Sequence, residues 1–461
     1  MSSQVNPASF RDPSGFVFEK DGVIFRQINQ SYSKEYDLLM QSGLYDTLVE
    51  SGWLIPHEEV TKQSSDSSGS AYKTIKPTRI PFISYPYEWS FNQLKDAALL
   101  TLNVQKKALE YGMSLKDASA YNIQFLNGKP VLIDTLSFEI YKEGKPWIAY
   151  KQFCQHFLAP LSLMKYRDVR LGQLLRVHQD GIPLDLASRL LPYRTYFTLP
   201  ILFHVHLHSS SQRHFSAKTF DKKKIEGKMS LWKLSSLIDD LSSFIQSLNW
   251  NPRHSQWSDY YCDDSYSPDA IEHKKEIVAS YLERIKPRTL WDMGSNTGLF
   301  SRLAGKQGIN VVSFDSDPAC VELNYLGCAD ENEVNVLPLL LDLTNPSPNT
   351  GWANQERLSL VDRGPSDAVL ALALIHHLAI ANNVSFHKIA SFFKDICEWL
   401  VIEFIPKSDP KVQRLLSTRQ DVFTDYSKES FEDSFKEFFE IEKSDKIQSS
   451  ERILYLMRTR K

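Results

Sequence analysis

A glycine-rich turn in the C-terminal half of the chain carries the first chemical pattern. It reads Asp292-Met293-Gly294-Ser295-Asn296-Thr297-Gly298, between a strand-like run and a helical pattern. Glycine is needed where backbone turns sharply or approaches a ligand closely, and a helix start presents free N–H groups. Asp315 and Asp342 end the next two predicted strands. The first can hydrogen-bond both ribose hydroxyls, and the second, or backbone beside it, can meet an adenine amino group.

The acid that opens the turn indicates which kind of cofactor fits. Asp292 stands where a dinucleotide site must leave room for a pyrophosphate. A carboxylate would repel phosphate, but it suits an ammonium group such as that of a methionine moiety. Two other interpretations stay open, namely an NAD-type site and acids that only cap strands and helices.

The turn, the two acids and a strand–helix–strand–strand ending resemble the class I S-adenosylmethionine-dependent methyltransferases. The resemblance covers about residues 268–461 and implies an α/β fold with a Rossmann-like seven-stranded sheet, whose closing strand is antiparallel and inserted beside the sixth. The implied cofactor is S-adenosylmethionine, with these candidate contacts: Asp292, Gly294, Ser295, Asn296, Gly298, Asp315, Ser316, Asp342 and Leu343. Asn296 departs from the family, in which many members have a middle glycine, but asparagine tolerates positive φ better than most residues.

Two adjacent histidines are the candidates for chemistry on the methyl acceptor. His376 and His377 follow the fourth predicted strand of this region, where the cofactor's methyl group would lie. Methyl transfer needs alignment above all, and a base helps if the acceptor is a hydroxyl or an acid. Either histidine could act as base or position the acceptor, because histidine titrates near neutrality. Packing beside the cofactor is the alternative, and Glu403 at the end of the fifth strand is a further candidate base.

The N-terminal half contains a second constellation of oxygen-bearing side chains. Asp117, Asn122 and Asp134 surround one predicted hairpin that follows a long helical pattern. This arrangement resembles the protein kinase-like fold of phosphotransferases, and the resemblance implies Asp117 as base, Asn122 and Asp134 as metal ligands, and ATP with Mg²⁺ as ligands.

Departures from the kinase pattern favour a degenerate module. Asp134-Thr135-Leu136 replaces Asp-Phe-Gly, the first hairpin has no glycine-rich phosphate loop, and Arg26 is the nearest cation where a strand lysine is usual. We therefore expect a kinase-like α+β module that recruits or orients the acceptor. An active phosphotransferase, whose methyltransferase-like domain only binds cofactor, an unrelated α+β domain and a non-catalytic binding protein remain alternatives.

Strands alternating with helical patterns must position the cofactor site, because this order predicts a parallel, doubly wound sheet. We expect a kinase-like module over residues 1–194, a helical extension over 195–267 and the methyltransferase domain over 268–461. In the first part we expect strands over Arg79–Tyr85, Asn122–Leu126 and Pro130–Asp134, and a helix over Phe91–Tyr111.

Two further clusters have open interpretations. His204, His206 and His208 alternate with apolar residues, so on a strand they would share one face, either as metal ligands or as an ordinary amphipathic surface. Aromatic residues precede the methyltransferase region and could cover the cofactor or pack in a core: Trp257, Tyr260, Tyr261 and Tyr266.

Composition bounds the class of protein and its partners. The 461 residues are 42% hydrophobic and 24% charged, which is ordinary for a globular protein of two or three domains. A formal net charge of -3 predicts no global attraction to nucleic acid or to an anionic membrane, although local basic patches remain possible. Five scattered cysteines without a CxxC pair, and no apolar run long enough to span a bilayer, predict a cytoplasmic protein. The acceptor (a small molecule, a sugar or a protein) and the oligomeric state cannot be read from the sequence.

Overall fold

The computed structural model describes residues 4–60, 70–207, 229–252, 268–417 and 420–460. The chain forms two compact units. The N-terminal unit comprises residues 1–251 together with 351–357, and the C-terminal unit comprises residues 252–350 and 358–461. The chain therefore leaves the C-terminal unit after Thr350, contributes a short segment to the N-terminal unit and returns at Leu358. None of the helices in the described ranges is long and apolar enough to cross a membrane.

The C-terminal unit is built around a mixed sheet of seven strands in the order β12-β11-β10-β13-β14-β16-β15. The five strands β10 to β14 pair in parallel, and β16 pairs antiparallel with both of its neighbours, so it alone runs against the other six. The antiparallel strand thus lies beside the sixth, as expected. The strands are β10 (Thr289–Met293), β11 (Asn310–Asp315), β12 (Val336–Leu340), β13 (Ser366–Ala371), β14 (Cys397–Phe404), β15 (Phe439–Lys446) and β16 (Ile453–Thr459).

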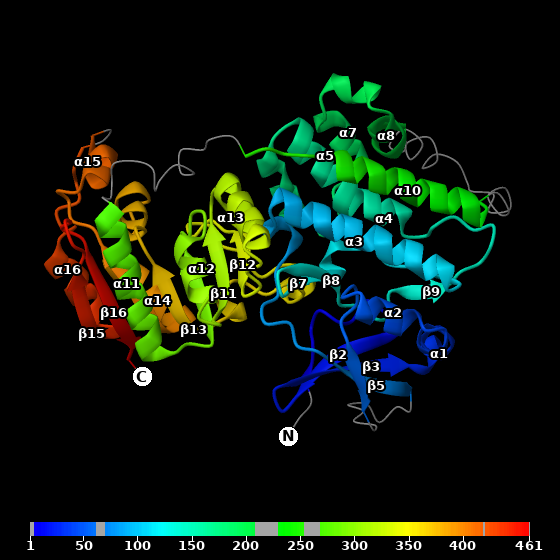
Figure 1. Cartoon of the computed structure of the whole chain (residues 1–461), viewed down its shortest axis with the longest axis horizontal. Coiled ribbons are helices and arrows are strands. Elements are labelled where there is room, and N and C mark those ends of the chain that lie inside the picture. The colour runs from blue at the N-terminus through cyan, green and yellow to red at the C-terminus, as the bar shows by residue number, and fades with distance from the viewer. Residues whose placement is uncertain (1–3, 61–69, 208–228, 253–267, 418–419, 461) are drawn as a thin grey trace. The chain divides into compact units, whose positions relative to one another are not determined.

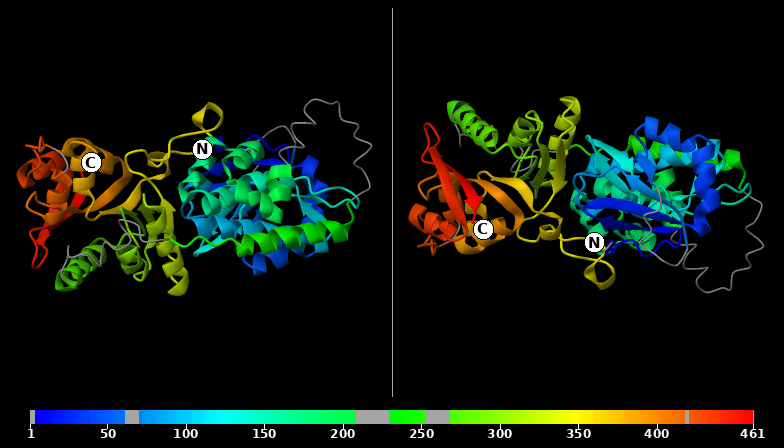
Figure 2. Two further views of the ribbon diagram at one scale, coloured as in Figure 1. Left: turned by 90° about the horizontal axis from the view of Figure 1, so that it is seen from above. Right: turned by 90° about the horizontal axis from the view of Figure 1, so that it is seen from below.

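Helices cover both faces of this sheet (Figures 1 and 2). On one face, Val278 and Phe300 share a core with strand residues such as Leu290 and Val401. On the other face, Phe386, Phe404 and Phe431 form part of an aromatic cluster. The helices of this unit are α11 (Pro268–Ile285), α12 (Leu299–Gly305), α13 (Pro318–Asp330), α14 (Phe386–Ile396), α15 (Pro410–Leu416) and α16 (Lys428–Lys436).

The N-terminal unit begins with a five-stranded antiparallel sheet in the order β1-β2-β3-β5-β4. Two shorter pairs, β6 with β9 and β7 with β8, follow the long helix α3. The strands are β1 (Gln4–Val5), β2 (Gly15–Lys20), β3 (Val23–Asn29), β4 (His57–Val60), β5 (Ala71–Pro77), β6 (Met113–Leu115), β7 (Ile123–Leu126), β8 (Lys129–Leu132) and β9 (Phe138–Ile140).

Helices make up most of the remainder of the N-terminal unit. The longest, α3, starts at a capping box in which the Ser90 hydroxyl accepts from the Gln93 N–H and the Gln93 side chain accepts from the Ser90 N–H. The helices are α1 (Ser33–Gln41), α2 (Leu44–Glu50), α3 (Phe91–Glu110), α4 (Tyr150–Phe153), α5 (Ala159–Tyr166), α6 (Leu174–Val177), α7 (Leu184–Leu190), α8 (Leu199–Ile201) and α10 (Leu231–Ser247).

Two expectations about strands were wrong. Residues 79–85 form no strand, and the strand lies earlier, at β5. The N–H groups of Ser84 and Tyr85 donate instead to side chains, those of Gln124 and Glu88, so this stretch needs no neighbouring strand. In the C-terminal unit β12 ends at Leu340, so Asp342 lies on the loop after the strand.

Candidate functional site

The glycine-rich turn lies at the carboxyl edge of the sheet, between β10 and α12. Gly294, Asn296 and Gly298 all have positive φ, at 78°, 54° and 80°. The N–H groups of Gly294 and Ser295 both donate to the Phe314 carbonyl at 2.9 Å, which fastens the turn to the end of β11. Gly298 has a second requirement, because a Cβ there would lie 2.0 Å from the side-chain oxygen of Asn324 on α13. The turn is thus fixed in shape, and it lies where open α/β sheets bind ligands.

Asp315 is held against this turn. One of its carboxylate oxygens accepts from the Asn296 N–H at 2.7 Å, and the other accepts from the Asp317 N–H at 2.9 Å. Burial raises the pKa of the Asp315 carboxyl to about 6, although these backbone donors oppose the shift. Each oxygen keeps a lone pair for a further donor, so the side chain can accept hydroxyl groups.

Asp292 is buried below the turn. Only 2% of the residue is exposed, and its carboxylate accepts from the Ser301 hydroxyl at 2.6 Å. Burial raises the pKa of Asp292 to about 7, and the nearby Asp315 adds to the shift. A cationic group bound here would lower the pKa of Asp292 again, so the site favours a positively charged ligand.

Asp342 and its neighbours complete the same edge. The Leu341 N–H donates to the Asp315 carbonyl at 2.8 Å, which brings the start of this loop beside β11. Asp342 is exposed, and its carboxylate accepts from the N–H and the hydroxyl of Thr344. Ser316 is exposed and Leu343 is half-buried. The residues expected from the sequence to hold the cofactor therefore lie along one edge of three neighbouring strands.

The two histidines follow β13 at this edge of the sheet. His376 is fully buried, and neither ring nitrogen has a hydrogen-bond partner among the described residues. Its ring lies against that of His377, with centroids 4.1 Å apart. Burial lowers the pKa of His376 well below its usual value and lowers that of His377 to about 4. Both imidazoles are therefore neutral near pH 7 and are weak bases.

A buried ionic network surrounds Glu403, and it was not predicted from the sequence. Lys274 of α11 lies 2.7 Å from the Glu403 carboxylate, which also accepts from the Ala373 N–H at 2.8 Å. Arg452 approaches the other carboxylate oxygen of Glu403 to 3.5 Å and binds Asp409 through two nitrogens. Glu403 is thus occupied in holding the turn after β13. The partners are too far apart in sequence for a local pattern to link them.

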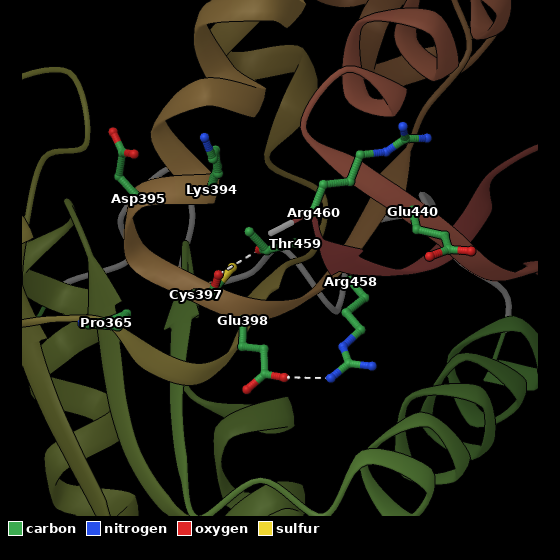
Figure 3. Close-up of a pocket in the computed structure, with 9 residues that line it drawn as sticks. All are labelled: Pro365, Lys394, Asp395, Cys397, Glu398, Glu440, Arg458, Thr459 and Arg460. Carbon is green, nitrogen blue, oxygen red and sulfur yellow. Dashed lines mark hydrogen bonds and ion pairs between the residues drawn. The ribbon is translucent and has the colours of Figure 1, made fainter.

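A pocket in this unit lies at the opposite edge of the sheet. Figure 3 shows it beside the start of β14 and the end of β16, where Arg458 pairs with Glu398 at 3.1 Å. Its charged side chains carry both signs. Because cofactors of open α/β sheets bind at the carboxyl ends of the strands, this pocket is not a candidate cofactor site.

In the N-terminal unit, Asp117, Asn122 and Asp134 lie near one another. Asn122 hydrogen-bonds Ser137, whose hydroxyl donates to Asp134 at 2.8 Å. The other Asp134 oxygen lies 2.6 Å from the Arg26 guanidinium and also accepts from the Leu136 N–H at 2.9 Å. Burial raises the pKa of Asp117, and the charge of Asp134 adds to the effect. Both oxygens of Asp134 are therefore already engaged by groups of the chain.

The structure describes two residues of the histidine cluster, and they do not share a strand face. His204 and His206 lie in a π-helix, Leu202–Leu207, and not on a strand, so the expected alternation does not apply. Their rings meet different residues, Tyr150 for His204 and Ser188 for His206. His208, Trp257, Tyr260, Tyr261 and Tyr266 lie outside the described residues.

The C-terminal unit has a mixed α/β fold whose seven-stranded order, with β16 antiparallel between β14 and β15, is typical of class I methyltransferases. No protein-family model matches the chain. The chain belongs to the family of the nodulation protein NoeA: it is 34% identical to that protein of Rhizobium meliloti (strain 1021) over 455 residues, which cover 97% of this chain and 94% of the relative.

Solved structures with partial similarity include two methyltransferases. Magnesium protoporphyrin IX methyltransferase from Synechocystis PCC 6803, with bound SAH, is 14% identical over 44% of this chain and 92% of its own, with a TM-score of 0.31. The N-methyltransferase NodS from Bradyrhizobium japonicum WM9 is 11% identical over 42% of this chain and 99% of its own, also with a TM-score of 0.31.

Proposed function

We propose that the protein is an S-adenosylmethionine-dependent methyltransferase. The observation that carries the proposal is the convergence of the turn, the buried Asp292 and the half-buried Asp315 at one edge of a methyltransferase-type sheet. Nine residues would hold the cofactor: Asp292, Gly294, Ser295, Asn296, Gly298, Asp315, Ser316, Asp342 and Leu343. When bound, the cofactor supplies an electrophilic methyl group on a positively charged sulfur.

The residues fit the separate parts of this cofactor. Asp292 would attract the ammonium of the methionine moiety, which explains why an acid is tolerated in a buried position. Asp315 would accept from the ribose hydroxyls with its remaining lone pairs, and Asp342 or the backbone beside it would meet the adenine. Gly294 and Gly298 carry no side chain, so the backbone at these two positions can approach the cofactor closely.

We propose that His376 positions the methyl acceptor. A fully buried imidazole without a hydrogen-bond partner among the described residues is costly unless a bound group forms the missing hydrogen bond. Its lowered pKa favours a hydrogen bond to the acceptor over proton abstraction. Replacing His376 with leucine should then reduce methyl transfer and weaken acceptor binding while S-adenosylhomocysteine still binds. Unchanged methyl transfer in the leucine variant would rule out this role. The same measurements on His377→Gln show whether the neighbouring histidine has it instead.

For the N-terminal unit we propose a kinase-like module without phosphotransfer activity, which recruits or orients the acceptor. The Arg26–Asp134 pair supports this proposal, because it neutralises the carboxylate that would have to bind Mg²⁺. The acceptor itself, whether a small molecule, a sugar or a protein, is not specified by these residues.

Calorimetric titration of S-adenosylmethionine and S-adenosylhomocysteine into the full chain tests the cofactor proposal. Binding should be lost in Asp315→Ala and retained in Asp330→Ala, which removes an exposed acid at the end of α13. If the folded wild-type protein binds neither compound, the proposal fails. If it does bind, methyl-labelled cofactor can then be used to screen acceptors of the three classes.

Titration of ATP with Mg²⁺ tests the proposal for the N-terminal unit. We expect no hydrolysis by the wild-type protein. Hydrolysis that disappears in Asp134→Asn and persists in Asp330→Asn would instead identify an active phosphotransferase.

A further inference from the structure

The helical segment that ends at residue 207 exposes apolar side chains. The short helix α8 runs directly into the π-helix Leu202–Leu207. Ile201 and Val205 are buried, whereas Leu199, Phe203 and Leu207 recur every four residues and are 63%, 56% and 47% exposed. A surface helix normally directs polar residues to solvent, so here both sides of the helix are apolar.

The preceding turn of 3-10 helix, Tyr193–Phe197, enlarges this surface. Tyr193 and Phe197 are each 89% exposed. In Figure 1, α7 and α8 form the upper end of the N-terminal unit, away from its strands. The five exposed side chains Tyr193, Phe197, Leu199, Phe203 and Leu207 are together called the apolar face below.

A buried histidine holds the apolar face in place. The Thr195 hydroxyl donates to the Pro192 carbonyl at 2.7 Å, so it must accept from His206 Nε2, 2.9 Å away. His206 Nδ1 then accepts from the Ser188 hydroxyl at 2.8 Å, and Tyr196 stacks on the ring with centroids 3.8 Å apart. The histidine thereby ties α7, the 3-10 turn and the π-helix together. The exposed side chains belong to a well-packed segment.

The charge of this part of the chain indicates what covers the apolar face. Residues 186–207 contain no acidic residue, and both arginines in this range, Arg189 and Arg194, are exposed. Aromatic and aliphatic side chains flanked by basic ones are the combination that binds anionic bilayer surfaces.

We propose that the apolar face binds peripherally to a bilayer that contains anionic lipids. Phe197, Leu199 and Phe203 would enter the headgroup region, and Arg189 and Arg194 would pair with lipid phosphates. Tyrosine and phenylalanine suit this boundary because their rings are apolar and, in tyrosine, end in a hydroxyl. Such a contact needs no spanning helix. It would place the N-terminal unit at a membrane surface, where a lipid-linked or amphiphilic molecule is accessible.

Co-sedimentation of the full chain with vesicles tests this inference. We expect binding to phosphatidylcholine vesicles that contain phosphatidylglycerol, weaker binding to phosphatidylcholine alone, and a decrease with added salt. The double variant Phe197→Ser/Phe203→Ser should bind at least about tenfold more weakly. Arg189→Gln should weaken binding by a few-fold, and only to the anionic vesicles. Val422→Ser, which changes a residue that is 64% exposed in the C-terminal unit, should bind as the wild type does.

Three results would overturn the inference. The first is a wild-type protein that sediments with neither kind of vesicle, and the second is a double variant that sediments as well as the wild type. The third is a wild-type protein that binds no vesicles but forms oligomers that the double variant lacks, which would identify the apolar face as a protein interface. Thermal unfolding controls for folding of each variant. S-adenosylhomocysteine titration of the same samples separates a failure here from a failure of the proposed methyltransferase function.

Discussion

Replacing Asp292 with asparagine should make the protein more stable at pH 8 and at the same time abolish binding of S-adenosylmethionine. Burial raises the pKa of this carboxyl from 3.8 to about 7, so above pH 7 the folded protein contains a buried charge that unfolding would release into water. Three pKa units correspond to about 4 kcal/mol. The asparagine retains an oxygen that can accept from Ser301, but its amide N–H groups gain no assured acceptor, at a cost of about 2 kcal/mol. The expected net gain is about 2 kcal/mol.

The sign of the pH dependence follows from the direction of the shift. A carboxyl whose pKa is raised in the folded state favours folding when it is protonated, and this contribution is lost as the pH rises from about 4 through 7. The asparagine variant lacks this titration. Its advantage should therefore be largest at pH 8 and should decrease by about 1.4 kcal/mol per pH unit below 7, so that it is gone by pH 5.

Urea unfolding at pH 8 and pH 5, with calorimetry for the cofactor, measures both effects. Asp330→Asn provides the matched change of an exposed acid and should alter neither quantity. A variant that is less stable at pH 8, or whose advantage does not change with pH, would refute the reasoning about burial. A variant that binds the cofactor as the wild type does would show that Asp292 does not contact it.

The remaining predictions concern the same glycine-rich turn and the ion pair of Arg26 with Asp134 in the N-terminal unit. Cofactor binding should weaken about tenfold between pH 8 and pH 6 as the carboxyl with a pKa of about 7 becomes protonated; calorimetry that finds a constant affinity would contradict this. Gly298→Ala should lower the free energy of unfolding by more than about 2 kcal/mol because of its φ of 80° and the clash with Asn324, whereas Gly308→Ala, with φ 79° and open space, should cost about 1 kcal/mol. If urea unfolding shows the same loss of unfolding free energy in both variants, the clash with Asn324 contributes nothing. Arg26→Met should cost about 3 kcal/mol by leaving Asp134 without its cation, and a neutral effect on thermal unfolding would show that the pair contributes little.

Local patterns predicted the C-terminal sheet well because its strands are short apolar runs separated by helices. The antiparallel ending followed from the resemblance, and β11 ends at Asp315 as expected. The turn and Asp315 could be predicted because backbone geometry restricts residue choice where a chain turns beside a ligand. The roles of these residues in cofactor binding remain predictions.

Long-range interactions explain what the sequence did not predict. The expected strand at residues 79–85 was wrong because side chains accept from its backbone N–H groups, and one of them, Gln124, lies 40 positions away from Ser84. The expectation that Glu403 could act as a base did not allow for Lys274 and Arg452, which lie 129 and 49 positions away in the chain. The excursion of residues 351–357 into the N-terminal unit also had no local signal, since it depends on contacts such as Arg11 with Glu356.

This excursion means that the protein cannot be divided into its two units by one cut. The units are joined by the backbone at three places, after residues 251, 350 and 357. Within the N-terminal unit the segment is held by the pair of Arg11 and Glu356, at 2.6 Å, and by Arg357 lying 4.2 Å from the Tyr121 ring centroid. A chain interrupted between residues 253 and 267 should therefore yield two fragments that copurify. A gene fragment encoding only residues 268–461 would produce the seven-stranded sheet, but its segment 351–357 would lack the N-terminal unit against which it packs.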